Sequence, residues 1–227
     1  MIGSRRQQPG GHLSFRSANP ALSAKTFAGM EGSTGKVMTV DGTVDRVAMS
    51  LAILLACGYL TYSMEITGLI FVGVIGGLIV ALVTIFKKHL SPITVPIYAA
   101  LEGVALGGIS FIFNQIYEGI AFQAIFLTLA ILFSLLFAYR TRLIKASENF
   151  KLGVAAATGG IFIVYMLSFV MSFFGSGLPI MDVNNSSLLS IGFSLFVVVI
   201  ASLNLVLDFD FIEQGAEMGA PKYMEWY

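Results

Sequence analysis

The sequence predicts an all-α polytopic membrane protein with six spanning helices. Of the 227 residues, 56% are hydrophobic and 11% are charged, whereas a soluble domain carries about 25% charged residues. Six apolar stretches are each long enough for a helix to cross a bilayer, which takes about 20 residues, and are too long for barrel strands. The polar connections between them are short. The expected fold is therefore a bundle of helices in lipid.

The bundle is expected to occupy residues 44–214, between a largely disordered polar tail at 1–43 and a polar segment at 215–227. Pro92 is expected to open the third span, because proline favours the first turn of a helix. The approximate bounds of the six spans are Val44–Met64, Ile66–Phe86, Pro92–Phe113, Gly119–Tyr139, Leu152–Phe174 and Leu188–Leu207.

Local signals refine this outline. Asn19 followed by Pro20 predicts a short helix over residues 21–27. The Asp-Gly pair within Met38–Val44 is typical of a hairpin turn. Small residues spaced three or four apart predict close contacts between helices. These small residues are Gly103 and Gly107 in the third span and Gly153, Ala157 and Gly160 in the fifth.

The lysine and arginine residues predict the orientation. They lie in the first 46 residues, in the second and fourth connections and after the sixth span, and the other three connections contain none. By the positive-inside rule, the N-terminal tail and residues 215–227 are cytoplasmic. The formal net charge of zero gives no argument for binding nucleic acid. Because Cys57 is the single cysteine, an intramolecular disulfide and a cysteine-cluster metal site are excluded.

Three carboxylates follow the apolar part of the sixth span, namely Asp208, Asp210 and Glu213. Carboxylates at the end of a membrane helix bind a cation, take up a proton or pair with a base. Helical geometry places Asp208 on one face with Asn204, and Asp210 on the other with Glu213. Acids at this end of a helix oppose its dipole and need compensation. The alternative is that they end the span and are solvated.

Glu102 lies near the middle of the third span. A glutamate at that depth is expected to face the bundle interior, where it is protonated or paired. It has either a functional role or a structural hydrogen bond. Catalytic sequence signatures are missing, and no nucleophile–base pair or metal constellation is evident. The protein is therefore expected not to be an enzyme and to need no cofactor.

Several motifs together resemble the Bax inhibitor-1 family, the transmembrane Bax-inhibitor-motif proteins, in its bacterial branch. The tail contains S-x-N-P-A-x-S-x-K-x-F at 17–27 and M-T-V-x-G-T at 38–43. The third span contains Y-A-x-L-E-G-x-x-L-G at 98–107, and the sixth ends in L-D-F-D-F-I-E at 207–213. The last segment contains G-A-P-K-x-M-E-W-Y at 219–227. The resemblance covers nearly the whole chain.

This resemblance implies a seven-helix fold with a central helix, of which the sequence contains six helices. It also implies a pH-sensitive calcium leak channel in a bacterial cytoplasmic membrane, gated by an acid late in the sixth helix and another in the seventh. Asp208 matches the first gating acid and is the expected calcium and proton site, Asp210 matches a less constrained position, and Lys88 is matched to the basic partner in the second helix. The second acid lies on the seventh helix, which residues 215–227 would lead to.

Two functions are consistent with these residues. The first is a calcium leak channel in which Asp208, Glu102 and Asp210 sense cations and protons, with the lipid bilayer, calcium and protons as partners. The second is a non-conducting regulator that binds another membrane protein, such as a quality-control protease, through the polar tail. Calcium flux through liposomes distinguishes them.

Overall fold

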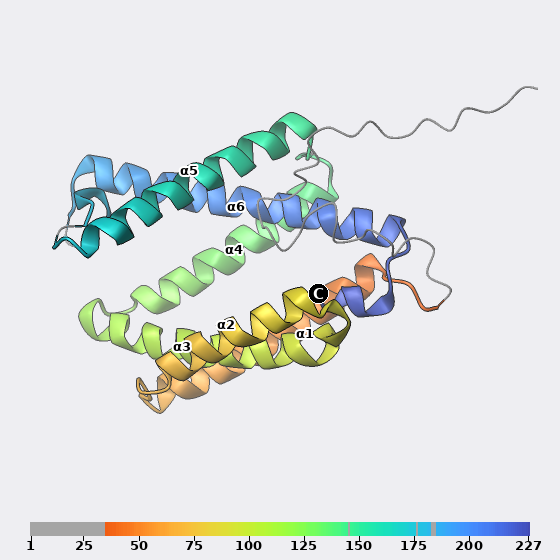
Figure 1. The fold of residues 1–227 in the computed structure, drawn as a ribbon, viewed down its shortest axis with the longest axis horizontal. Coiled ribbons are helices and arrows are strands. Elements are labelled where there is room, and N and C mark those ends of the chain that lie inside the picture. The colour runs from red at the N-terminus through yellow and green to blue at the C-terminus, as the bar shows by residue number, and fades with distance from the viewer. Residues whose placement is uncertain (1–34, 145, 176, 183–184) are drawn as a thin grey trace, which may run out of the picture. The chain divides into compact units, whose positions relative to one another are not determined.

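The structure is a computed structural model that describes residues 35–144, 146–175, 177–182 and 185–227. These residues form the helices α1 to α6 and the short 3-10 helices η2, η3 and η4 (Figure 1). They divide into two compact units, one over Ala146–Leu207 and the other over 35–144 and 208–227. The division falls inside α6. The helix predicted at 21–27 lies outside the described residues.

The α1 helix (Val40–Ser63) begins four residues before the first predicted span. Thr39 is its N-cap in an extended conformation, and the Thr39 side chain accepts a hydrogen bond of 3.0 Å from the Gly42 amide. Asp41 and Gly42 consequently lie in the first helical turn. The hairpin predicted over Met38–Val44 is therefore wrong, because a capping threonine directly before these residues starts a helix instead.

The next three helices match the predicted order. They are α2 (Ile70–Phe86), α3 (Ser91–Ile116) and α4 (Ile120–Arg140). Pro92 lies in the first turn of α3, as predicted. The α2 helix is shorter than the predicted span, because the chain turns at Glu65, where φ is +57°, and stays non-helical to Leu69. Within the described residues, five of the six α-helices are long and apolar enough to span a membrane, and α2 is a shorter apolar helix.

Glycines bring α1, α2 and α3 into backbone contact. A Cβ atom added to Gly103 would collide with the carbonyl oxygen of Leu54 in α1, and one added to Gly107 with that of Gly58. On the other side of α3, a Cβ on Gly73 of α2 would lie 2.6 Å from the carbonyl oxygen of Leu101. The predicted close contacts of Gly103 and Gly107 are confirmed. Such contacts let helices associate in lipid, where burial of apolar surface offers little driving force.

The other unit is built from α5 (Glu148–Ser172) and the first two thirds of α6 (Leu188–Glu217). Asn204 of α6 donates a 2.9 Å hydrogen bond to the Thr158 hydroxyl of α5. The rings of Tyr165 and Phe193 also pack together, with their centroids 6.5 Å apart. Gly153 and Gly160 face open space with respect to the described residues. Within this unit, polar and aromatic side chains rather than these two glycines join α5 to α6, and contacts of Gly153 and Gly160 with other helices stay a prediction.

The α6 helix continues ten residues beyond the predicted end of the sixth span at Leu207. Asp208, Asp210 and Glu213 therefore lie within the helix rather than at its end. Backbone hydrogen bonds of these residues are satisfied within the helix, so the acids do not terminate it. The unfavourable interaction between Asp208 and the helix dipole is also small, because the dipole acts mainly within the last turn and Asp208 lies before that turn.

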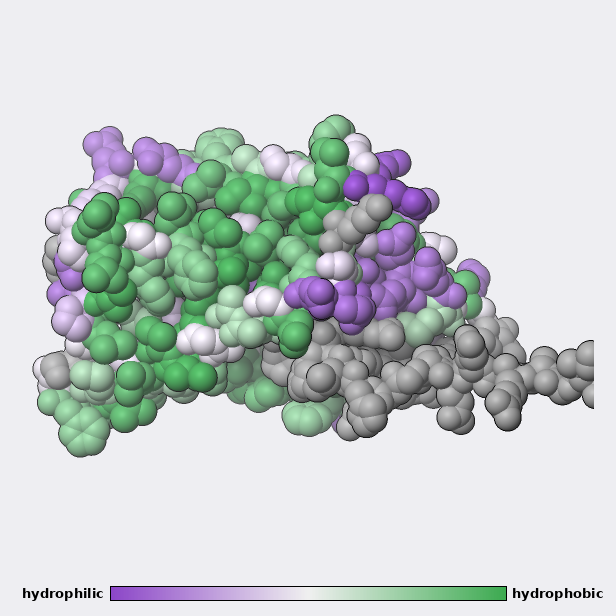
Figure 2. All heavy atoms as spheres, turned by 90° about the horizontal axis from the view of Figure 1, so that it is seen from above, coloured by the Kyte–Doolittle hydropathy of each residue, from purple (hydrophilic) through white to green (hydrophobic). Residues whose placement is uncertain are grey.

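The outer surfaces of the helices are apolar, as lipid contact requires. Large hydrophobic side chains such as Phe71, Phe86, Phe133 and Phe174 are more than half exposed. Figure 2 shows hydrophobic side chains over much of the visible face, with hydrophilic ones gathered toward its two sides. Polar groups near the ends of apolar helices fit an integral membrane protein.

The glycine contacts predict that glycine-to-alanine substitutions change the free energy of unfolding differently at packed and at open positions. Gly107→Ala should lower the free energy of unfolding by about 1–3 kcal/mol, because the new Cβ overpacks the backbone of Gly58. Gly159→Ala is the matched control, since open space surrounds Gly159 and alanine favours the helix by up to about 1 kcal/mol. Thermal unfolding in detergent, followed by circular dichroism, measures both. Equal stability of the two variants would contradict the close contact.

Candidate ion-sensing site

Asp208 directly follows two fully buried residues of α6. Val206 and Leu207 have no exposed surface, whereas Asp208 is half-buried. Its carboxylate accepts no hydrogen bond from the residues that the structure describes. Asn204, one turn before it, donates to Thr158 and to the carbonyl oxygen of Ile200. Asn204, the polar residue predicted to share a helix face with Asp208, therefore donates its hydrogen bonds to other residues. Asp208 is left as a carboxylate in an apolar part of α6.

The other two acids of α6 have neutral hydrogen-bond donors. The Gln214 side chain donates to Asp210 one turn away, and the Tyr139 hydroxyl in the last turn of α4 donates to Glu213 at 2.5 Å. The Tyr139 ring also packs on Phe209, with a centroid distance of 5.7 Å. Glu213 is exposed, but the hydrogen bond to Tyr139 ties it to α4. Asp210 and Glu213 thus each accept a hydrogen bond from a neutral side chain, which distinguishes them from Asp208.

Glu102 faces the contact between α2 and α3. It is half-buried, and one of its carboxylate oxygens would lie 3.2 Å from a Cβ atom at Gly77 of α2. Tyr98 lies one turn earlier on α3. The absence of a side chain at Gly77 makes room for the acid between the helices. The structure thus places Glu102 inside the three-helix unit, as expected for a carboxylate at that depth.

Lys88, the predicted basic partner of Asp208, lies in η2 (Lys88–Leu90) between α2 and α3. Its ammonium group is 5.7 Å from the ring centroid of Tyr227, within the range of a cation–π interaction. The structure therefore brings Lys88 to the segment that follows α6. Its pairing with Asp208 stays a prediction.

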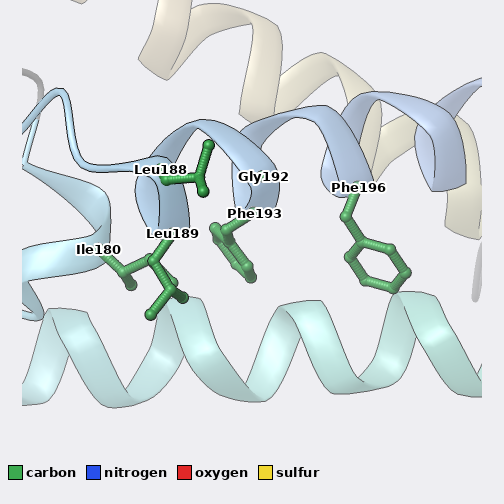
Figure 3. Close-up of a pocket in the computed structure, with 6 residues that line it drawn as sticks. All are labelled: Ile180, Leu188, Leu189, Gly192, Phe193 and Phe196. Carbon is green, nitrogen blue, oxygen red and sulfur yellow. The ribbon is translucent and has the colours of Figure 1, made fainter.

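A pocket of about 600 Å³ is lined by Ile180 and by the first turns of α6 (Figure 3). Its side chains are apolar, and Figure 3 shows Leu189 and Phe193 directed toward α5. The lining residues are Ile180, Leu188, Leu189, Gly192, Phe193 and Phe196. None of these side chains can ligate a cation or exchange a proton, so this cavity contributes no ionisable group to the site. In addition, no cluster of three or more metal-ligating side chains occurs in the described part of the chain.

The structure shows one important carboxylate that the sequence analysis missed. Glu225 is 3% exposed and accepts hydrogen bonds from the Thr39 amide (3.0 Å), the Thr39 hydroxyl (2.9 Å) and the Lys222 ammonium (2.6 Å). Burial by itself raises the pKa of Glu225, but the bonds from Lys222 and Thr39 outweigh it and hold the pKa below the usual value of 4.5. The spacing of Lys222 and Glu225 could have suggested their pairing, whereas no local signal points to Thr39, 186 residues away.

A family model described as Bax inhibitor 1 like matches residues 19–227. The chain belongs to the Bax inhibitor 1-like family. Among curated proteins and among solved structures, none matches the chain. Membership agrees with the all-α polytopic fold and with an integral membrane location. It also covers the residues considered above, since Glu102, Asp208 and Glu225 all lie in the matched region of this Bax inhibitor 1-like protein.

The hydrogen bond between Tyr139 and Glu213 should be measurable as a coupling. In a double-mutant cycle, Tyr139→Phe and Glu213→Gln should show an interaction free energy of about 0.5–1.5 kcal/mol, because each variant weakens the same bond. Chemical unfolding in detergent micelles gives the four free energies. Tyr62→Phe is the control, because its ring packs with Phe111 and Phe122, and it should be additive with Glu213→Gln. A Tyr139–Glu213 coupling no larger than that of the control pair would show that the bond is unimportant in solution.

Proposed function

We propose that this Bax inhibitor 1-like protein is a pH-sensitive leak channel for cations, with calcium as the transported ion. The observation that carries the proposal is Asp208, a half-buried carboxylate in an apolar helix that accepts no hydrogen bond from the described residues. A carboxylate in this environment needs either a proton or a cation to compensate its charge. Competition between the two at one carboxylate provides a physical basis for pH sensitivity.

The proposed gate responds to the charge of Asp208. When Asp208 is ionised, it attracts a cation into the path. When it is protonated, the attraction is lost and the packing of the α6 side chains around it changes. Asp210 and Glu213 differ from Asp208 because Gln214 and Tyr139 already satisfy part of their hydrogen-bonding capacity. They are assigned an auxiliary role in which their charge raises the local cation concentration.

Glu102 is proposed as a second ionisable position deeper in the membrane. One of its carboxylate oxygens lies beside Gly77 in the contact between α2 and α3. A carboxylate at this depth requires compensation of its charge, which a proton or a passing cation can supply. The positive-inside rule supports a cytoplasmic location for the end of α6, where Asp208 would read the cytosolic pH.

The Asp208→Asn variant tests this assignment. Asparagine keeps the size of the side chain but removes the titratable charge. We expect calcium flux into liposomes to fall about tenfold, equivalent to a rise of about 1.4 kcal/mol in the barrier, and its dependence on pH to disappear. Asp45→Asn is the matched control, because Asp45 is an exposed carboxylate in α1. Unchanged flux and unchanged pH dependence in Asp208→Asn would remove Asp208 from the gate.

A second candidate function is that of a non-conducting regulator that docks another membrane protein through the polar segment before α1. The structure sharpens the design of the deletion that separates the two functions. Residues from Lys36 onward bond to the segment after α6, so the deletion should remove residues 1–34 and no more. Under the leak proposal, purified protein without residues 1–34 should conduct calcium as the full chain does. Loss of partner capture together with no flux in either protein would favour the regulator.

A further inference from the structure

The segment 219–227, here called the clasp segment, returns from α6 to the beginning of α1 (Figure 1). It leaves α6 through Gly219, whose φ of +68° allows the sharp change of direction. The Met38 amide then donates to the carbonyl oxygen of Ala220 at 2.7 Å, and the Lys222 amide donates to that of Lys36 at 3.0 Å. These backbone bonds hold the clasp segment against the residues that precede α1.

Glu225 fixes the clasp segment to the first turn of α1. Three donors converge on one of its oxygens, two from Thr39 and one from Lys222. The carboxylate lies over Gly42, where an added Cβ atom would collide with it. A negative charge at the N-terminus of a helix also interacts favourably with the helix dipole. Glu225 therefore supplies α1 with a cap from a distant part of the chain.

The clasp segment has further contacts on both sides of Glu225. The Ser91 hydroxyl at the start of α3 donates to the carbonyl oxygen of Tyr223 at 2.7 Å, and Ser91 is completely buried. The guanidinium of Arg46 in α1 lies 5.1 Å from the ring centroid of Trp226. With Lys88 against Tyr227, the clasp segment thus contacts α1, η2 and α3 through different side chains.

We propose that the clasp segment couples the end of α6 to the first turns of α1 and α3, with Glu225 as the residue that locks it. Only one residue, Met218, lies between the end of α6 and Gly219, the first residue of the clasp segment. Because this connection is so short, a movement of α6 moves the clasp segment with it. A displacement of the carboxylate-bearing end of α6 is therefore transmitted to α1 and α3 while the lock is closed. When the lock is open, these ends move independently. The coupling does not depend on the proposed leak.

The charges around the lock determine when it opens. Lys222 is the cation that bonds to Glu225 directly. Asp41 lies exposed in the first turn of α1. The cations Arg46 and Lys88 are engaged with Trp226 and Tyr227. Because the bonds to Glu225 hold its pKa below 4.5, their contribution to stability is present above that value and is lost as the pH falls through the lowered pKa. The lock is therefore closed at neutral pH.

Hydrogen exchange on the full chain in lipid nanodiscs tests the coupling. Glu225→Ala removes the shared acceptor, so the amides of Thr39 and Gly42 should exchange about tenfold faster at neutral pH. The amides of Met218 and Ala220 should accelerate with them, whereas those of Gly103 and Ala105 in the α3 contact should not. Asp45→Asn is the control and should change none of these amides.

The possible outcomes separate coupling from general stabilisation. Faster hydrogen exchange both at Thr39 and Gly42 and at Met218 and Ala220, with exchange in α3 unchanged, supports the proposal. No acceleration at Thr39, acceleration at Thr39 without Met218, or equal acceleration throughout α1 to α3 overturns it. If Glu225→Ala does not fold, Lys222→Met removes the cation that bonds to Glu225, and Trp226→Leu removes the ring that contacts Arg46. In both variants the amides of Thr39, Gly42, Met218 and Ala220 should exchange faster, and those of Gly103 and Ala105 should not.

Discussion

Gly103 and Gly107 bring the backbone of α3 against carbonyl oxygens of α1, while Gly73 brings α2 against the opposite side of α3. In a lipid environment, helices gain little from burying apolar surface against one another, so packing at this distance supplies much of their association. The larger unit depends on these contacts. They fix the position of Glu102 beside Gly77, and they bring the starts of α1 and α3 close enough for one short segment to contact both.

Carboxylates in this protein lie in environments that differ in how their charge is compensated. Glu225 has a cation and two donors from a helix N-cap, which keep it ionised. Glu213 and Asp210 have neutral donors from Tyr139 and Gln214. Asp208 has no hydrogen-bond donor from the described residues. These differences support a structural role for the buried Glu225, and they are the basis on which Asp208 is proposed as the sensor.

The sequence was sufficient for much of this architecture, because hydrophobic length and helical periodicity are local properties. The spans, the contacts of Gly103 and Gly107 and the inward position of Glu102 followed from such properties. The hairpin prediction at Met38–Val44 failed because the Asp-Gly signal competed with a capping threonine. The ends of α2 and α6 also differed, since hydropathy marks the apolar part of a helix rather than its last hydrogen bond. The clasp could not be predicted, because Thr39 and Glu225 meet only through the fold.

The bond between Thr39 and Glu225 also has a consequence for synthesis of the protein. The two residues are 186 positions apart, so translation at about 5–20 residues per second separates their appearance by roughly 10 to 40 s. During that time the first membrane helix inserts with an unfinished amino-terminal turn. Its completion waits for residue 225 to leave the ribosome, which makes assembly of the clasp a late folding step.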